Sequence, residues 1–239
     1  MKTPDLGLPA GVEVHVDDTP DQVALALADA AAEVLASRLE QAERASLVVS
    51  GGSTPLPFFK ALAQKSLAWS RVDVLLADER WVPEDHPDSN TRLVKASLLQ
   101  GPAAAARYLS LKQPGDTPAE GLAAASAAVA DLELPLDVVI LGMGNDGHTA
   151  SLFPDAPELA HALSAACPDR VAPASPPSQS QRRITLTRPV LQGARFTALH
   201  LKGQDKLDTL QRALAEPDNL AAMPIRAFLT PGLSLFWSP

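Results

Sequence analysis

Short runs of consecutive apolar residues alternate along the chain with longer stretches in which apolar residues recur every three or four positions. The first pattern is typical of buried strands, and the second of helices packed on one face. Strands are predicted at residues 12–16, 46–50, 72–77, 136–141, 183–187, 195–201 and 233–237. Helices are predicted at about residues 19–44, 55–64, 90–99, 117–132 and 204–215.

Two of the predicted helices begin with a recognisable capping signal. Thr19 and Thr117 are each followed by proline and, three positions on, by Gln22 or Glu120. This arrangement is typical of a capping box with proline in the first helical turn. Strands separated by such helices predict βαβ units, so we expect one α/β domain over residues 1–239. We expect a Rossmann-like, mainly parallel sheet flanked by helices, with its ligand site at the carboxyl ends of the strands.

Composition narrows the class of protein. The chain has 239 residues, of which 46% are hydrophobic and 20% charged, as in ordinary soluble domains. The net charge of −8 argues against a nucleic-acid partner, and no apolar run is long enough to span a membrane. The first ten residues lack the apolar core of a secretory signal, so we expect a cytoplasmic protein.

The sequence gives little support for a metal site or a disulfide. Cys167 is the only cysteine, which excludes an intramolecular disulfide framework and a multi-cysteine zinc site. His15, His86, His161 and His200 share no metal-type spacing and the HExxH motif is absent, so no metal site is expected. The proline-rich stretch at residues 168–177 is expected to be a long irregular loop.

A glycine-rich turn joins the second predicted strand to the helix that follows it. Gly51 and Gly52 allow a tight turn that exposes backbone N–H groups, and Ser53 and Thr54 add hydroxyl donors. Together with a helix N-terminus, such a turn suits a phosphate group. The alternative is a plain strand-to-helix turn with Ser/Thr capping. The Gly-Lys-Ser/Thr ending of a Walker A loop is absent.

A charged segment follows the third predicted strand. Asp78 could act as a base or hold a partner, and Arg80 could bind an anion or stabilise a developing oxyanion. The alternative is a solvated loop with a surface Asp–Arg pair. Ser89, further on, is expected to cap the next helix.

A second glycine-rich turn, GMGNDGHT at residues 142–149, follows the fourth predicted strand. It contains Gly-x-Gly-x-x-Gly, but Pro154 is badly placed for the long helix that a dinucleotide-binding motif needs. His148 could serve as a general base, because imidazole titrates near neutral pH, and Asp146 could orient it. The alternative is a hydrogen-bonded structural histidine.

A protein with a net charge of −8 needs local positive charge to bind an anion. The candidates are Arg182 and Arg183 around the fifth predicted strand, and Lys202 and Lys206 near the start of the last predicted helix. The sequence does not decide within either pair, and each side chain could be a solvated surface charge.

Taken together and in this order, these segments resemble the 6-phosphogluconolactonase family. The resemblance covers roughly residues 12–237 and rests on four strings of residues. They are SGGSTP, DERWVP followed by SN, LGMGNDGHTASLFP, and RITLT. It implies the α/β fold of glucosamine-6-phosphate deaminases and ribose-5-phosphate isomerases. In deaminases the residues around the histidine are typically GDGHIAFNEP, and DEY stands where this chain has DERWVP. Both segments of this chain therefore favour the lactonase.

The resemblance implies hydrolysis of 6-phospho-D-glucono-1,5-lactone to 6-phospho-D-gluconate in the oxidative pentose phosphate pathway. His148 then matches the proposed general base, Arg80 faces the lactone, and Asp146 and Asp78 orient these groups or bind hydroxyls. The glycine loop, Gly51, Gly52, Ser53 and Thr54, would hold the phosphate together with Arg183 and Lys206. A lactone carbonyl is already electrophilic, so no metal and no cofactor are expected.

Two other functions remain open from the sequence. The first is an amino-sugar phosphate deaminase or isomerase on the same fold, which release of ammonia from glucosamine 6-phosphate would reveal. The second is a non-catalytic sugar-phosphate sensor, which would bind the ligand without turnover. We expect a small sugar-phosphate lactone as the partner, no nucleic acid or membrane, and a monomer or weak homodimer.

Overall fold

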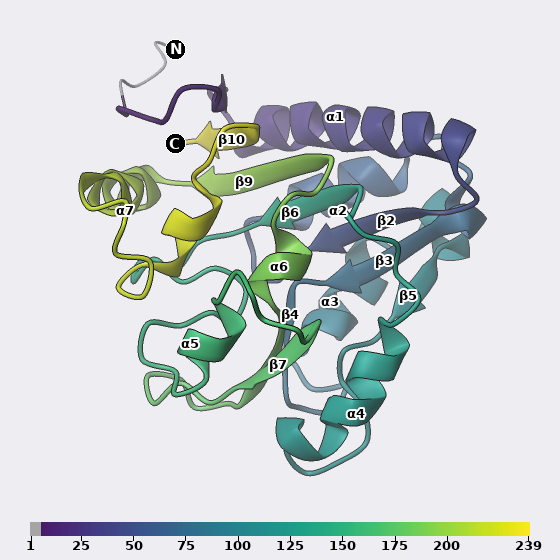
Figure 1. Ribbon diagram of the computed structural model, residues 1–239. Helices are drawn as coiled ribbons and strands as arrows, with labels where there is room; N and C mark the ends of the chain where they lie inside the picture. The colour runs from purple at the N-terminus through teal and green to yellow at the C-terminus, as the bar shows by residue number, and fades with distance from the viewer. Residues whose placement is uncertain (1–5) are drawn as a thin grey trace.

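Seven parallel strands form the main sheet of the protein, whose computed structural model describes residues 6–239 (Figure 1). Residues 1–5 of the expected domain lie outside the described residues. In order across the sheet, the strands are β1 (Glu13–Val16), β10 (Leu233–Ser238), β9 (Phe196–Lys202), β6 (Val138–Leu141), β2 (Ala45–Val49), β3 (Val72–Leu76) and β5 (Arg107–Leu109). The predicted α/β fold with a mainly parallel sheet is therefore confirmed.

Helices flank this sheet, and α1 lies across β2, β6, β9 and β10 on one face (Figure 1). The α-helices are α1 (Pro20–Gln41), α2 (Leu56–Ala63), α3 (Asn90–Ser97), α4 (Pro118–Ala128), α5 (Leu159–Ala162), α6 (Arg188–Leu191) and α7 (Gln204–Ala215). Short 3-10 helices span Trp69–Arg71, Gly101–Ala105 and Pro224–Phe228. No helix in the described part of the chain is long and apolar enough to cross a membrane.

The predicted helix starts have the expected caps. The Thr19 hydroxyl accepts a hydrogen bond from the Gln22 N–H at the start of α1. The Thr117 hydroxyl accepts one from the Glu120 N–H at the start of α4. The Ser89 hydroxyl accepts one from the Arg92 N–H at the start of α3, as expected for an N-cap.

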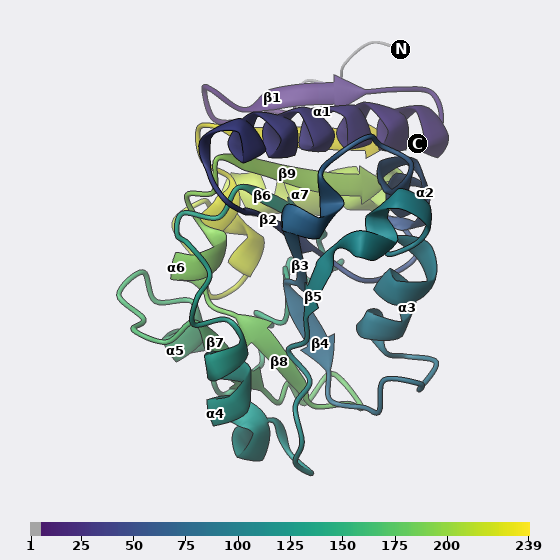
Figure 2. The ribbon, with the colours of Figure 1, turned by 90° about the vertical axis from the view of Figure 1, so that its right-hand side faces the viewer.

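A second, antiparallel sheet corrects two details of the prediction. Its strands are β4 (Asp78–Arg80), β8 (Arg183–Leu186) and β7 (Val171–Ala174), with β8 in the middle (Figure 2). The polar loop expected between β3 and Asn90 thus begins with a three-residue strand, whereas residues 81–89 are irregular as expected. Part of the proline-rich stretch is also a strand, and Pro173 is tolerated because β7 is an edge strand. The predicted strand at residues 183–187 exists, but in this sheet.

The strand order reverses between β2 and β6. From β2 the chain continues to β3 and β5 on one side, whereas β6, β9 and β10 follow one another on the other side. The loops that follow β2 and β6 therefore leave the sheet in opposite directions and open a crevice between them. In open α/β sheets, ligands bind at this switch point.

Polar side chains fix β2 against β6 at both ends. At the far end from the crevice, the Asp137 carboxylate accepts hydrogen bonds from the N–H and hydroxyl of Ser46, at 2.8 and 3.1 Å. At the crevice, the Ser50 hydroxyl donates to the Ile140 carbonyl (3.0 Å) and accepts from the Gly142 N–H (3.3 Å). Every residue of β2, β3 and β6 is buried, as expected for central parallel strands.

Candidate active site

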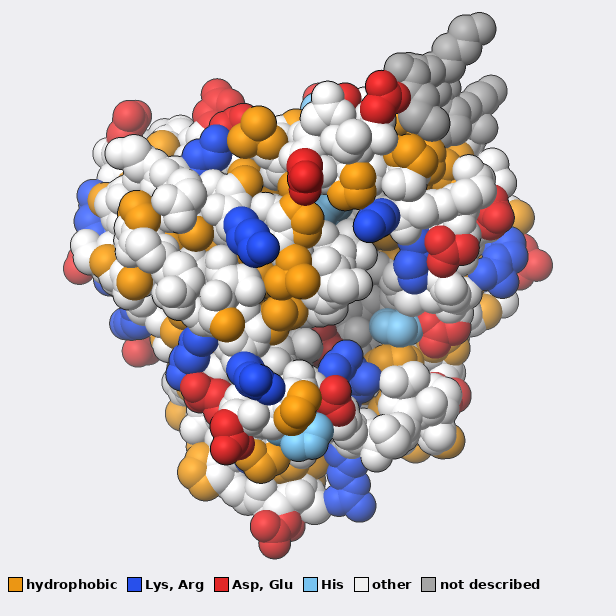
Figure 3. Space-filling model, turned by 180° about the vertical axis from the view of Figure 1, so that it is seen from behind, with side chains coloured by type: hydrophobic (Ala, Val, Ile, Leu, Met, Phe, Trp, Pro, Cys, Tyr) orange, Lys and Arg blue, Asp and Glu red, His pale blue; other side chains and the backbone are white. Residues whose placement is uncertain are grey.

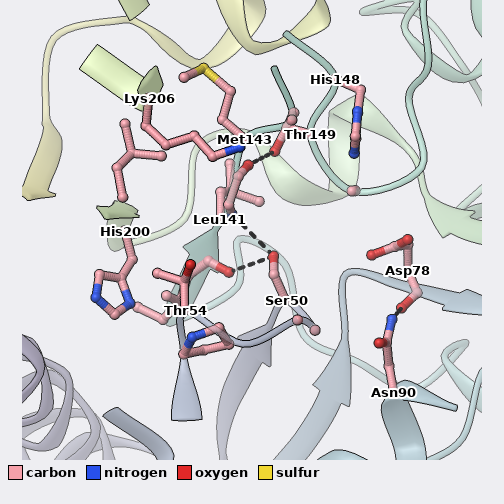
Figure 4. A pocket seen from close by; sticks show the side chains of 18 of the residues that line it. Ser50, Thr54, Asp78, Asn90, Leu141, Met143, His148, Thr149, His200 and Lys206 are labelled. Atoms are coloured by element: carbon pink, nitrogen blue, oxygen red, sulfur yellow. Dashed lines mark hydrogen bonds between the residues drawn. The ribbon is translucent and has the colours of Figure 1, made fainter. Parts of the chain in front are cut away.

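A cavity of about 200 Å³ opens at the carboxyl ends of β2, β3, β6 and β9, where the switch point places it. In Figure 3 a hollow in the surface is bordered by basic and histidine side chains, and Figure 4 shows the cavity from close by. The polar and charged side chains that line it are those of Ser50, Thr54, Asp78, Arg80, Asn90, His148, Thr149, Arg183, His200, Lys202 and Lys206.

The glycine loop after β2 forms one wall of the cavity. Gly51 is required there, because a Cβ atom would lie 2.1 Å from Oδ1 of Asn90. Gly52 has a φ of +98°, in the left-handed region that favours glycine. Gly51, Gly52 and Thr54 line the cavity, whereas Ser53 is exposed and does not. No side chain caps α2, but Pro55 and Pro57 have no N–H and the Leu56 N–H donates to the Ser53 carbonyl at 3.4 Å. Backbone donors for an anion would therefore come from the glycine loop and not from the first turn of this helix.

Glu79 is a structural residue, which the sequence did not reveal. Its side chain is 1% exposed and accepts hydrogen bonds from the N–H groups of Asn90 and Thr91 at 2.9 and 2.7 Å. It also accepts from the Arg80 N–H and the Thr91 hydroxyl, both at 2.7 Å. The carboxylate thereby ties β4 to the N-terminus of α3 and directs its two neighbours, Asp78 and Arg80, toward the cavity.

The arginines Arg80 and Arg183 lie directly opposite each other in the pairing of β4 with β8. Like charges in this position repel, and among residues 6–239 each arginine has a single carboxylate partner within 4 Å. Asp78 Oδ2 is 3.7 Å from Arg183 and accepts a 2.5 Å hydrogen bond from the Ser151 hydroxyl. Nε of both arginines is buried without a hydrogen-bond partner in the described residues. This arrangement favours an anion between the two side chains.

Burial is the main influence on the guanidinium of Arg183, which is 9% exposed, and it lowers the pKa of that group. The nearby Asp78 carboxylate acts in the opposite direction. The guanidinium also donates to Gln179 Oε1 at 3.0 Å and lies 5.2 Å from the centre of the Phe153 ring. Arg182 does not line the cavity.

The turn after β6 brings His148 and Asp146 together. Nδ1 of His148 lies 2.5 Å from Oδ1 of Asp146, which also accepts the His148 N–H at 3.1 Å. Gly144 makes this possible, because a Cβ atom there would lie 2.1 Å from the imidazole ring. The ring stacks on Phe153 with centroids 4.0 Å apart. No hydrogen bond within the described residues reaches Nε2, so this nitrogen is available to a ligand.

Asp146 is ionised in this arrangement. Burial alone would raise the pKa of its carboxyl, but the hydrogen bonds from the imidazole and the backbone N–H of His148 help to outweigh burial and lower the pKa. A carboxylate that accepts from Nδ1–H leaves the lone pair on Nε2, which is the form a general base needs. Asp146 itself contacts His148 and does not line the cavity.

Two lysines reach the cavity from the β9–α7 segment. Lys206, on the first turn of α7, donates from Nζ to Asn145 Oδ1 at 2.6 Å, and Lys202, at the end of β9, is exposed. Both line the cavity, so their positions do not decide which of the two would hold the phosphate. The sequence left the same question open. Figure 4 shows Lys206 on the opposite side of the cavity from Asp78 and Asn90.

His200 is a wall residue that sequence reasoning missed. It shares no metal-type spacing with the other histidines, and no chemical role was predicted for it. In the structure it lines the cavity and is 5% exposed. No spacing or motif indicates this position, since only the neighbouring strand β6 and the glycine loop bring it to the crevice.

Outside the cavity, the exposed His161 lies beside Asp169 and the buried Cys167. Asp169 Oδ2 and Cys167 Sγ both approach the same ring nitrogen, Nε2, at 2.8 and 3.4 Å. A proton relay needs the two ring nitrogens to contact different partners, so this cluster lacks the geometry of a Cys–His–Asp triad.

Comparison with known proteins first identifies the broad class of proteins to which the chain belongs. The model of the family described as glucosamine-6-phosphate isomerases/6-phosphogluconolactonase matches residues 18–237. A monomeric glucosamine-6-phosphate deaminase has the same fold, with a TM-score of 0.76 at 16% identity over 95% of this chain and 97% of that one. The fold thus belongs to this class of α/β proteins.

Closer relatives narrow the class to one family. A 6-phosphogluconolactonase of Pseudomonas aeruginosa is 46% identical over 239 residues, which is 100% of both chains. The crystal structure of a 6-phosphogluconolactonase from Shewanella baltica has a TM-score of 0.93 at 40% identity, covering 98% of this chain and 100% of that one. The chain belongs to the 6-phosphogluconolactonase family, and the resemblance seen in its motifs is confirmed.

Proposed function

We propose that the protein hydrolyses 6-phospho-D-glucono-1,5-lactone to 6-phospho-D-gluconate, a step of the oxidative pentose phosphate pathway. Its membership of the family supports the reaction. The observation that carries the mechanism is the contact of 2.5 Å between Asp146 and Nδ1 of His148, which leaves Nε2 free at the wall of the cavity.

In the first step, Nε2 of His148 takes a proton from a water molecule as the water oxygen forms a bond to the lactone carbonyl carbon. Asp146 stabilises the positive charge that develops on the imidazole. The carbonyl oxygen becomes an oxyanion, and Arg80, whose side chain is 30% exposed at the cavity, is placed to stabilise it.

In the second step, the tetrahedral intermediate collapses and the bond between the carbonyl carbon and the ring oxygen breaks. The imidazolium of His148 returns its proton to that oxygen, which leaves as a hydroxyl group on the open-chain product. General-base catalysis of this kind contributes roughly 10²–10⁴-fold to a rate. Because the lactone carbonyl is already electrophilic, we propose that the reaction needs no metal and no cofactor.

The rest of the cavity holds the substrate. Gly51, Gly52 and Thr54 offer N–H and hydroxyl donors to the phosphate, and Lys206 and Arg183 offer positive charge. Asp78 is positioned to bind a sugar hydroxyl or to orient Arg183. A role for the exposed Ser53 remains a prediction. We also propose that residues 1–239 form one lactonase domain, which acts in the cytoplasm as a monomer or weak homodimer.

The test is to generate the lactone in place from glucose 6-phosphate and to follow its disappearance. The lactone hydrolyses by itself, so a blank without protein is essential. We expect the wild type to accelerate hydrolysis and His148→Ala to lose roughly 10²–10⁴-fold of kcat, with the fold intact by circular dichroism. His161→Ala, an exposed histidine outside the cavity, is the matched control and should behave like the wild type.

Two outcomes would contradict the proposal. A His148→Ala protein with near wild-type turnover would remove the general-base assignment. A wild type that does not exceed the blank would remove the lactonase function, and release of ammonia from glucosamine 6-phosphate would then identify a deaminase.

A further inference from the structure

His200 is a buried histidine in the wall of the cavity. It lies near the carboxyl end of β9, is 5% exposed, and lines the cavity together with Thr54, Lys202 and Lys206. Figure 4 shows His200 across the cavity from His148, on the side where Lys206 and Thr54 are drawn. It is therefore not part of the proposed proton-transfer machinery around His148.

The imidazole of His200 has no polar partner. Nδ1 is fully buried and no hydrogen bond in the described part of the chain reaches it or Nε2. Part of the ring contacts Phe58 edge to face, with centroids 6.3 Å apart. A buried polar group without a partner costs about 1–3 kcal/mol, so each such group calls for an explanation. An aliphatic residue would fill this strand position without that cost.

The ring is neutral when the cavity is empty, because burial lowers the pKa of His200 to about 4. A neutral imidazole carries one N–H. Because Nδ1 is enclosed, Nε2 is the nitrogen that a ligand in the cavity can reach. His200 can thus offer a hydrogen-bond donor without adding a net charge, next to two lysines that already supply positive charge.

The surroundings of His200 indicate which part of a ligand it would meet. The same side of the cavity carries Thr54, at the end of the glycine loop that also contributes Gly51 and Gly52 to the wall. Lys202 and Lys206 add two cations. Backbone N–H groups, a hydroxyl and cations around one spot suit a phosphoryl group, which has several acceptor oxygens.

We propose that His200 is a substrate-binding residue that donates a hydrogen bond from its imidazole to a phosphate oxygen of the ligand held at Thr54 and Lys206. The proposal rests on the proposed function only in that the ligand is a phosphate ester. The side chain would then distinguish phosphorylated from unphosphorylated lactones, because removing the phosphate takes away the partner of Nε2, the one ring nitrogen that a ligand can reach.

A direct test uses the full-length protein labelled with ¹⁵N-histidine and inorganic phosphate as the probe. We expect the ring nitrogen signals of His200, assigned by their loss in His200→Gln, to shift as phosphate saturates the protein. Sodium chloride at equal ionic strength should leave them in place. His200 signals that do not respond to saturating phosphate would overturn the proposal.

Substitution gives a second, independent readout. His200→Leu removes the donor and should weaken the Kd for inorganic phosphate by about 10- to 100-fold, the range expected for a hydrogen bond to a charged group. It should raise KM for the phosphorylated lactone more than it lowers kcat. His200→Gln, which keeps an amide donor, should recover most of the affinity, and His161→Gln is the matched control at an exposed histidine.

The two proposals fail in different ways. If phosphate shifts the His200 signals but the lactone is not hydrolysed, the proposed function is wrong and the phosphate contact stands. If the lactone is hydrolysed and His200→Leu retains both Kd and KM, the phosphate contact is wrong and the function stands. If His200→Leu fails to fold, the ¹⁵N titration of the wild type still decides the matter.

Discussion

The carboxylate two positions before His148 controls the state of the proposed base. Asp146 contacts both Nδ1 and the backbone N–H of His148, and Gly144 leaves room for the contact. These bonds lower the pKa of Asp146 against the effect of burial, so the side chain is an anion at neutral pH. An anion at Nδ1 holds the ring in one orientation and stabilises the imidazolium that forms during the reaction.

We expect Asp146→Asn to lower kcat by about 10- to 100-fold, part of the full contribution of a general base, with little change in KM. Because folding lowers the pKa of Asp146, its contribution to stability is present at neutral pH and is lost as the pH falls below 3.8. The difference in unfolding free energy between wild type and variant should therefore shrink in acid, as measured by urea unfolding.

The control for this variant is Asp218→Asn, which changes an exposed aspartate outside the cavity. It should leave kcat unchanged. A wild-type kcat for Asp146→Asn would show that the carboxylate only shapes the turn.

At the same scale, the sequence predicted one histidine of the cavity and missed the other. His148 and Asp146 are two residues apart in a glycine-rich turn, so their contact is local and can be read from the spacing. His200 reaches the cavity through the pairing of β9 with β6, which joins residues about 60 positions apart. Such pairing leaves no local signal in an apolar strand.

Among the elements, β4 and α3 depend on each other through one carboxylate. Glu79 receives the N–H groups that would otherwise be unpaired at the start of α3, together with the Arg80 N–H. A carboxylate at a helix N-terminus is also favoured by the helix dipole. The charged segment after β3 was predicted to be a loop because its sequence is polar, but Glu79 points inward and pairs the segment into a strand.

We expect Glu79→Gln to destabilise the protein by about 3 kcal/mol, because an amide cannot accept all these bonds and presents its own N–H groups to donors. Urea unfolding measures the loss. Glu84→Gln is the matched control, since Glu84 is exposed and its ion pair with Lys95 is worth less than about 1 kcal/mol. Equal effects of the two substitutions would contradict the structural role of Glu79.

Over the whole molecule, the proposed anion site lies in a protein of net charge −8. The two sheets resolve this conflict by bringing cations from distant parts of the chain to one crevice. Arg80 ends β4 and Arg183 begins β8 in the antiparallel sheet, whereas Lys202 ends β9 of the main sheet and Lys206 lies on α7. The alternation of strand and helix patterns in the sequence predicted the main sheet and a ligand cavity at the carboxyl ends of its strands. The antiparallel sheet that pairs Arg80 with Arg183 was not predicted, because its strands come from segments about a hundred residues apart.

Because a ligand that binds only the folded state stabilises it, inorganic phosphate should raise the melting temperature. At 100 times its Kd the gain is about 2.7 kcal/mol. At roughly 2–4 °C per kcal/mol for a protein of this size, Tm should rise by about 5–10 °C in a thermal scan.

Potassium chloride at equal ionic strength should give a much smaller shift. Arg183→Ala should reduce the shift caused by phosphate, whereas Lys60→Ala, an exposed lysine on α2 outside the cavity, should retain it. Equal shifts with phosphate and chloride would mean that the basic crevice does not bind a phosphoryl group, because general screening of charge would then account for the whole effect.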